Sequence, residues 1–195
     1  MKDFLRHINL KNQKFGCYLN SDDSETLTLT VDIQNELNNS ASENEISILK
    51  QLIPDNNIEI IEFYKLFNGI TLYCNGDTSG LQFYPINSLV NLNEEWKEGH
   101  LEFEDDELYE YQKGGVAFGD ISHSGNYFVF FDGKVFYDDH DGGDDTPVGE
   151  TFNEFLSKIV TNPADFLYEM GCYTRYSDGK TNGQYIPKRF IADEN

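Results

Sequence analysis

The stretch from Asp138 to Asp145 (DDHDGGDD) carries a dense group of carboxylates. Hard oxygen ligands of this kind suit Ca²⁺ or Mg²⁺. If an EF-hand loop is counted from Asp139, Asp141 takes the third place and Glu150 the twelfth. However, Asp144 stands at the sixth place, where such a loop needs glycine, and a predicted strand precedes it where an EF-hand has a helix. We therefore interpret the stretch as a solvated loop, keep a cation site as the alternative, and assign no metal ligand or cofactor.

No motif for nucleophilic or phosphate chemistry is complete in the sequence. The chain lacks the patterns of phosphate-binding loops and of zinc proteases, and the run Ser122 to Gly125 (SHSG) lacks the first glycine of the G-x-S-x-G motif. A thiol pair of His123 with Cys74 or Cys172 has no support from spacing. We assign no catalytic residue. A metal-dependent enzyme is the least favoured function, and it would rest on His123, Asp138, Asp139, His140 and Asp141.

The acidic segment from Gly99 to Lys113 is a candidate binding site, because its carboxylates alternate with aromatic and aliphatic side chains. Carboxylates steer an encounter with a cationic surface, and aromatic rings anchor the contact. The alternative interpretation is a solvent-exposed helix face, or a segment that extends out of the domain, with no binding role. On the binding hypothesis, the residues that contact a protein partner are Glu102, Glu104, Asp105, Asp106, Glu107, Glu110, Tyr109, Tyr111 and Trp96.

The overall charge limits the class of partner. The chain of 195 residues has 35 acidic and 14 basic side chains, and its formal net charge is −21. Such a surface repels nucleic-acid phosphates and anionic membranes, so we expect neither as a partner. A basic protein partner and simple solubility both remain explanations of the acidity.

The sequence also indicates a compartment. No window approaches the ~18 consecutive apolar residues of a membrane span, and the N-terminus lacks the apolar core and cleavage site of a secretory signal. The three cysteines are odd in number and have no C-x-x-C spacing, which argues against a disulfide framework. We therefore expect the protein in a reducing cytoplasm.

A β-hairpin is the firmest local prediction, and it leads into the candidate cation loop. Residues Asn126 to Phe131 (NYFVFF) and Lys134 to Asp138 (KVFYD) are predicted strands, joined by Asp-Gly, which favours a type I′ turn. The first strand does not alternate with polar residues, so we expect both of its faces to be covered. One cover is the helix predicted over Thr151 to Val160, whose apolar residues share one face.

The remaining elements are predicted from the periodicity of apolar residues and from the residues that start or end helices and strands. Helices are predicted over 1–10, 42–53, 58–67 and 163–170, with capping-box spacing at Ser42 and proline at the first position of the last helix. Residues 11–14 are expected to break the first helix, and 87–96 to form a helical or irregular crossover. Strands are predicted over 15–19, 26–33, 70–74 and 81–84, and the C-terminal tail is expected to form a turn and a short strand.

This order of elements resembles the SUKH superfamily, which includes yeast cell-wall assembly regulators, Syd proteins and many bacterial toxin-immunity proteins. The segments that carry the resemblance are IIEFYKLFNG, a strand leading to Phe-Tyr-Pro-Ile, and SLVNLNEEW. Further along, VAFGDISHSGNYFVFFDGKVFYDDHDGG is similar to the family's glycine-bearing strand pair, and ETFNEFLSKIV to its closing helix. The tail YSDGKTNGQYIPKRF is similar to endings of immunity-type members. The chain departs from the pattern at Ile53-Pro54 and in its long acidic segment.

The resemblance implies an α+β fold class: a single domain with a mostly antiparallel β-sheet packed against several helices, and no catalysis. Residues 42–190 would form this domain, 1–41 an N-terminal helix and hairpin in one unit with it, and 191–195 a tail. The implied function is a non-catalytic protein-binding module, most simply an immunity protein that neutralises a cognate toxin with a basic, nuclease-like surface. The alternative is an adaptor or regulatory scaffold that binds a host protein through the same sheet face.

Overall fold

The computed structural model describes residues 1–21, 25–53, 57–76, 80–101, 108–122, 124–140, 142, 144–170 and 175–193. Within these residues it is a single α+β domain with two antiparallel sheets and seven helices. The predicted fold class is therefore confirmed. The helices are α1 (Lys2–Ile8), α2 (Glu43–Leu52), α3 (Ile58–Leu66), α4 (Ile86–Leu101), α5 (Glu110–Gly114), α6 (Phe152–Thr161) and α7 (Pro163–Glu169).

The larger sheet has six antiparallel strands in the order β3-β4-β5-β6-β7-β8. Its strands are β3 (Gln34–Leu37), β4 (Ile70–Cys74), β5 (Leu81–Phe83), β6 (Val116–Ile121), β7 (Tyr127–Phe131) and β8 (Lys134–Asp138). The predicted hairpin is β7 and β8. Asp132 and Gly133 both have positive φ, 49° and 77°, as a type I′ turn requires.

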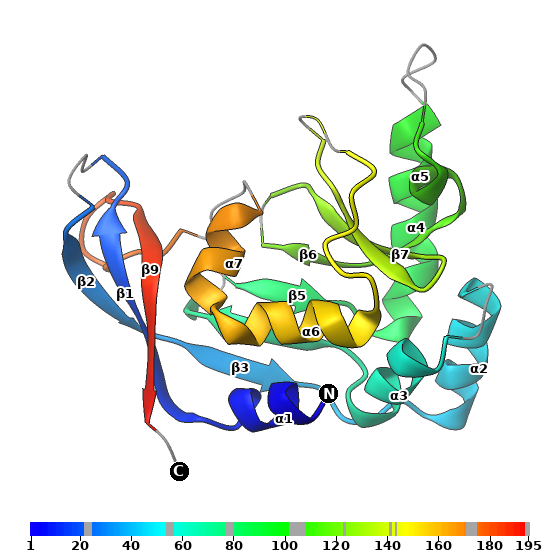
Figure 1. Cartoon of the computed structure of the whole chain (residues 1–195), viewed down its shortest axis with the longest axis horizontal. Helices are drawn as coiled ribbons and strands as arrows, with labels where there is room; N and C mark the ends of the chain where they lie inside the picture. The colour runs from blue at the N-terminus through cyan, green and yellow to red at the C-terminus, as the bar shows by residue number, and fades with distance from the viewer. Residues whose placement is uncertain are drawn as a thin grey trace.

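The smaller sheet has the order β2-β1-β9 and joins the two ends of the chain. Its strands are β1 (Lys11–Leu19), β2 (Leu27–Asp32) and β9 (Tyr185–Asp193). Residues 11–14, which the sequence predicted to break the first helix, lie beyond the end of α1 and form the start of β1. Lys11 pairs with β9, and Lys14 pairs with both β2 and β9. Residues 191–193, assigned to the tail from sequence, extend β9. Figure 1 shows this sheet to one side of the larger sheet.

The two faces of the larger sheet are covered by different helices. On one face, Phe152 and Phe155 of α6 pack with Phe128 of β7 in the main core. On the other face, Trp96 of α4 packs in a second cluster with Val129. Figure 1 shows α6 and α7 in front of the sheet, and α4 with α5 on the side of the sheet away from the smaller sheet. This confirms that β7 is covered on both faces.

Local capping explains where two of the helices start. The Ser42 side chain accepts from the Glu45 N–H, and the Glu45 carboxylate accepts from the Ser42 N–H, so α2 begins with the predicted capping box. At α6, the Thr151 side chain accepts from the Glu154 N–H at 3.1 Å, but the Glu154 carboxylate accepts from the Glu150 N–H and not from the Thr151 N–H.

Among the described helices, none combines the length and the apolar composition that a membrane span requires.

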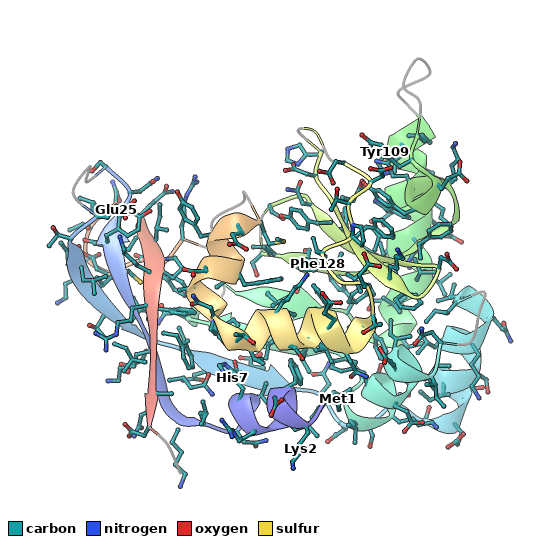
Figure 2. The ribbon with its side chains drawn as sticks, in the orientation of Figure 1. Met1, Lys2, His7, Glu25, Tyr109 and Phe128 are labelled. Atoms are coloured by element: carbon teal, nitrogen blue, oxygen red, sulfur yellow. The ribbon has the colours of Figure 1, made fainter. Side chains whose placement is uncertain are left out.

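A buried histidine connects α1 to the core. His7 is a buried residue of α1 on the side of that helix that faces α6 (Figure 2), and its Nε2 lies 3.1 Å from the Tyr73 hydroxyl. The hydroxyl's single proton is donated to the Ile159 carbonyl at 3.1 Å, so the neutral His7 ring donates from Nε2. Burial lowers the pKa of His7 to about 4 from its usual value of 6.5.

Folding stability should therefore decrease on mild acidification. Between pH 6.5 and pH 4 the unfolded chain protonates His7 and the folded chain does not, so the free energy of unfolding is highest above pH 6.5 and falls toward pH 4. Between pH 7 and pH 5 we expect His7 to account for about 1 to 2 kcal/mol, reduced by solvent access from an adjoining pocket. Urea unfolding of the wild type and His7→Gln at both pH values measures this difference, and parallel pH dependences would contradict it.

Candidate partner-binding surface

A buried carboxylate at the end of β8 holds two helices against the larger sheet. Asp138, the last residue of β8, is only 5 % exposed. Its Oδ2 accepts from Trp96 Nε1 at 2.6 Å and lies 3.0 Å from His100 Nε2. Its Oδ1 accepts from Gln112 Nε2 at 2.8 Å and from the Tyr111 hydroxyl at 3.3 Å. Both oxygens are thus held by side chains, two to each oxygen.

These donors come from two helices that are distant from β8 in sequence. Trp96 and His100 are four residues apart on α4, which places them on one face of the helix. Tyr111 and Gln112 lie in the short helix α5. Burial, together with the charge of Asp138, raises the pKa of Tyr111 well above its ordinary value, so its hydroxyl remains a donor. Asp138 therefore fixes both α4 and α5 against the end of the sheet.

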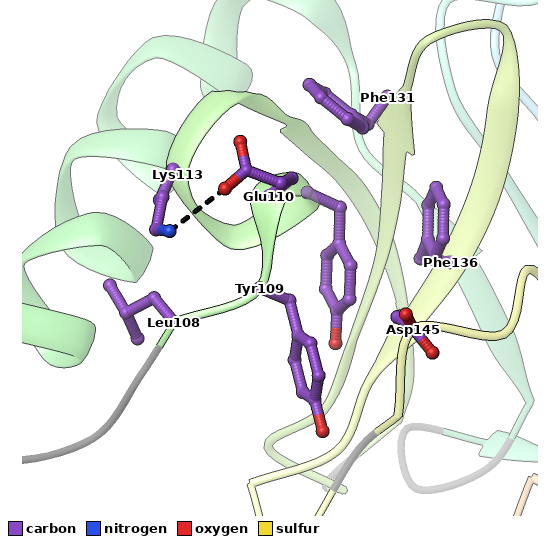
Figure 3. A pocket seen from close by; sticks show the side chains of 8 residues that line it. Leu108, Tyr109, Glu110, Lys113, Phe131, Phe136 and Asp145 are labelled. Carbon is purple, nitrogen blue, oxygen red and sulfur yellow. Dashed lines mark hydrogen bonds and ion pairs between the residues drawn. The ribbon is translucent and has the colours of Figure 1, made fainter.

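Three aromatic rings stack outward from the sheet beside this carboxylate. The Tyr111 ring lies parallel to the Phe136 ring of β8, with centroids 4.7 Å apart. Tyr109 stacks on the other side of Tyr111 at 5.7 Å and 8°. Tyr111 is 2 % exposed and Tyr109 is 38 % exposed, so the buried rings support an exposed one. Figure 3 shows this stack, with Tyr109 at its outer end.

Tyr109 lies at the border of two pockets, because it lines both of them together with Leu108. One, of about 430 Å³, is also lined by Glu110, Lys113 and Asp145, and in it Glu110 pairs with Lys113 at 3.0 Å (Figure 3). The other has a volume of about 640 Å³ and is also lined by Trp96. An exposed ring between two hollows is the geometry expected of an anchor residue in a protein interface.

The negative charge is unevenly distributed along the chain. Residues 33–174 contain 27 acidic and 6 basic side chains, so this span carries the whole formal charge of −21. The two terminal segments, which build α1 and the smaller sheet, are balanced, with 8 acidic and 8 basic side chains. The electrostatic potential of the protein is therefore set by the part that contains the larger sheet and the surface around Tyr109.

The structure separates the predicted partner-binding residues into three groups. Tyr109 and Glu110 are exposed, next to each other. Trp96 and Tyr111 are buried, so they support the surface instead of forming it. The third group lies outside the described residues and comprises Glu102, Glu104, Asp105, Asp106 and Glu107. Sequence reasoning missed Gln112 and His100, although the four-residue spacing of His100 from Trp96 on a helix was visible.

The candidate cation loop and thiol pair are only partly described. His123, Asp141, Gly143 and Cys172 lie outside the described residues. His140 Nδ1 lies 2.5 Å from the Asn126 side-chain oxygen, which also accepts from the His140 N–H. Within the described ranges, no group of three or more histidine, cysteine or acidic side chains is placed to hold a metal ion.

Comparison with known proteins identifies the family. The model of the SMI1/KNR4 family (SUKH-1) matches residues 57–158, which run from the cap of α3 into α6 and include Trp96, Tyr109 and Asp138. No match was found among curated proteins. The matched span is more than half of the chain and contains β4 to β8 of the larger sheet together with α4 and α5. The chain therefore belongs to the SMI1/KNR4 family (SUKH-1).

Proposed function

We propose that this protein is a non-catalytic immunity protein that binds a cognate toxin domain with a basic surface and neutralises it. The observation that carries the proposal is the exposed Tyr109 ring, held on two buried rings between two pockets with acidic residues in their walls. Membership of the SMI1/KNR4 family is consistent with a protein-binding module of this type.

Tyr109 has the properties of an interface anchor. Its ring is prepositioned by stacking on Tyr111, so little side-chain entropy is lost when a partner covers it. Tyr111 in turn is fixed by Phe136 and by its hydrogen bond to Asp138. Tyrosine is enriched among the residues that dominate binding energy, because it combines a large apolar area with a polar tip.

The negative charge of the protein accounts for the choice of a basic partner and for a high rate of association. A toxin that acts on nucleic acid presents a basic surface to phosphates, and a protein with a net charge of −21 can occupy that surface. The acidic residues from Glu102 to Glu110 are the densest charge in this part of the sequence, and Tyr109 lies among them, two residues after Glu107 and one before Glu110. Association should therefore be fast at low salt and slower at high salt.

The identifying experiment is a pull-down from the native cell with the tagged protein as bait, at low and at high salt. The expected result is a basic domain that elutes at high salt and that stops growth when it is produced without this protein. Recovery of a resident regulatory protein instead would contradict immunity and favour the adaptor function.

With the partner identified, Tyr109→Ala should weaken binding by about 2 kcal/mol, roughly thirtyfold in Kd. Tyr168→Ala is the matched control, because Tyr168 is also exposed but lies on α7, away from both pockets. Its Kd should stay within about twofold of the wild type. Calorimetric titration of the three proteins measures the effect, and equal Kd values for Tyr109→Ala and Tyr168→Ala would reject the assignment of this surface.

A further inference from the structure

We propose that the larger pocket beside Tyr109 receives an arginine side chain of the protein partner. The inference rests on the proposed function, because it specifies which group of the partner enters this surface. Two observations carry it: the residues that line the pocket, and the buried carboxylate of Asp138 among them.

The pocket combines aromatic walls with carboxylates. Its volume of about 640 Å³ lies within the ~300–1,000 Å³ range of sites that take small ligands. Among the described residues that line it, none is lysine or arginine, so the walls do not supply a full cation of their own. The walls contain three indole or phenol rings, Trp96, Tyr109 and Tyr127, and two imidazole rings, His100 and His140. The carboxylates are Glu95, Asp138 and Asp139.

Asp138 supplies a negative charge that its neighbours leave uncompensated. Three of its four hydrogen-bonding partners, Trp96, Tyr111 and Gln112, are neutral donors. The fourth is His100, which is a cation only when protonated. Because both oxygens of Asp138 are already engaged, it attracts a cation through its field and not through a direct bond. Low-dielectric walls concentrate that field in the pocket.

Glu95 and Asp139 are placed to make the direct contacts. Glu95 lies one residue before Trp96 on α4 and is exposed, whereas Asp139 follows Asp138 and is half-buried. The two therefore bring carboxylates into the pocket from different elements, α4 and the end of β8. A carboxylate has about four acceptor sites, so each has the capacity to accept from an incoming guanidinium.

Arginine fits these walls better than lysine does. A guanidinium is planar, so it stacks on aromatic faces, and its fork of donors matches carboxylate geometry. An ammonium is a more strongly hydrated point charge that gains less from flat walls. A toxin surface that binds phosphates is expected to offer arginine, for the same reasons of geometry.

The test uses a small probe and the intrinsic signal of the pocket. Trp96 is the only tryptophan of the chain and lines the pocket, so its fluorescence reports occupancy. The probes are N-acetyl-arginine amide and its uncharged analogue, N-acetyl-citrulline amide. We expect saturable quenching or enhancement by the arginine probe and at least about tenfold weaker binding of the citrulline probe, because charged hydrogen bonds are lost.

A matched pair of double variants locates the effect. Glu95→Gln with Asp139→Asn removes two charges from the pocket, whereas Glu94→Gln with Glu98→Gln removes two exposed charges of α4 that line neither pocket. The first pair should raise the Kd of the arginine probe by about tenfold or more, and the second by less than about twofold. Equal effects of the two pairs, or equal binding of the two probes, would overturn the proposal.

The outcomes also separate this inference from the proposed function. If the arginine probe binds as expected but the native cell yields no toxin, the pocket assignment stands and immunity fails. If a toxin is recovered and both double variants bind it equally, immunity stands and the arginine pocket fails. In the expected case, the pocket variant alone weakens binding to the toxin as well as to the probe.

Discussion

Replacing Asp138 by alanine is expected to lower the free energy of unfolding by about 3 to 5 kcal/mol. The side chain is buried and accepts hydrogen bonds from Trp96, Tyr111 and Gln112, with His100 also within 3.0 Å. Alanine would leave these groups without their acceptor, and each donor that stays buried and unpaired costs about 1 to 3 kcal/mol. Water entering from the neighbouring pocket would satisfy some of them, which keeps the total below a simple sum.

The measurement is urea unfolding followed by the fluorescence of Trp96, with far-UV circular dichroism as a second probe. Asp138→Asn should fall between the wild type and the alanine variant, because it keeps one acceptor but turns an N–H₂ group toward two donors. Asp145→Ala is the control, since Asp145 is exposed, and it should change stability by less than about 0.5 kcal/mol. An alanine variant at position 138 as stable as this control would refute the organising role.

Loss of Asp138 should also have a functional consequence. Without this acceptor, α5 loses its two side-chain hydrogen bonds to β8, and Tyr109 loses part of the support beneath it. The alanine variant should therefore bind the partner more weakly than its loss of stability alone explains. Stability and binding can be separated, because Tyr109→Ala removes the outermost, 38 % exposed ring of the stack and should lower the free energy of unfolding far less than Asp138→Ala does.

Local chemistry made several elements predictable from the sequence. The Asp132-Gly133 turn, the capping box of Ser42 and Glu45, and the apolar face of α6 each depend on residues close together in the chain. The periodicity of such segments reports which face is buried, whatever the rest of the fold does. For the same reason, the cover of both faces of β7 was predictable from its unbroken apolar run, although only one of the two covering layers was.

Contacts between distant segments could not be predicted. β3 was missed because Gln34 to Leu37 has little strand character, and it forms only because β4 supplies a free edge. The C-terminal strand pairs with β1 across most of the chain, which no local pattern encodes. The contacts of α4 and α5 with the Asp138 carboxylate of β8 also join segments that are distant in the sequence, so no local pattern predicts them. The sequence placed Asp138 at the end of a predicted strand and at the start of the candidate cation stretch, whereas its burial and its four side-chain partners give it a structural role.

Phe155→Ala is expected to lower the free energy of unfolding by about 3 to 5 kcal/mol, the usual cost of a large aromatic cavity. Phe155 is fully buried on α6, and its ring contacts Phe128 at 5.0 Å and Phe83 at 5.9 Å between centroids. Phe118, Phe152 and Phe166 contact it as well. No neighbouring side chain can fill the vacated volume without leaving its own ring contacts, so the cavity should persist.

This substitution also tests whether the two faces of the sheet unfold together. Phe155 lies in the main core, whereas Trp96 lies in the cluster on the opposite face. In a single cooperative domain, Trp96 fluorescence and circular dichroism should report the same lowered midpoint. Phe155→Leu should cost less, because leucine keeps part of the buried volume, and Tyr168→Ala on α7 should cost little because that ring is exposed. A Trp96 transition that stayed at the wild-type midpoint would show that the partner-binding end unfolds independently of the core, and the support of Tyr109 would then come from Asp138 and its ring stack alone.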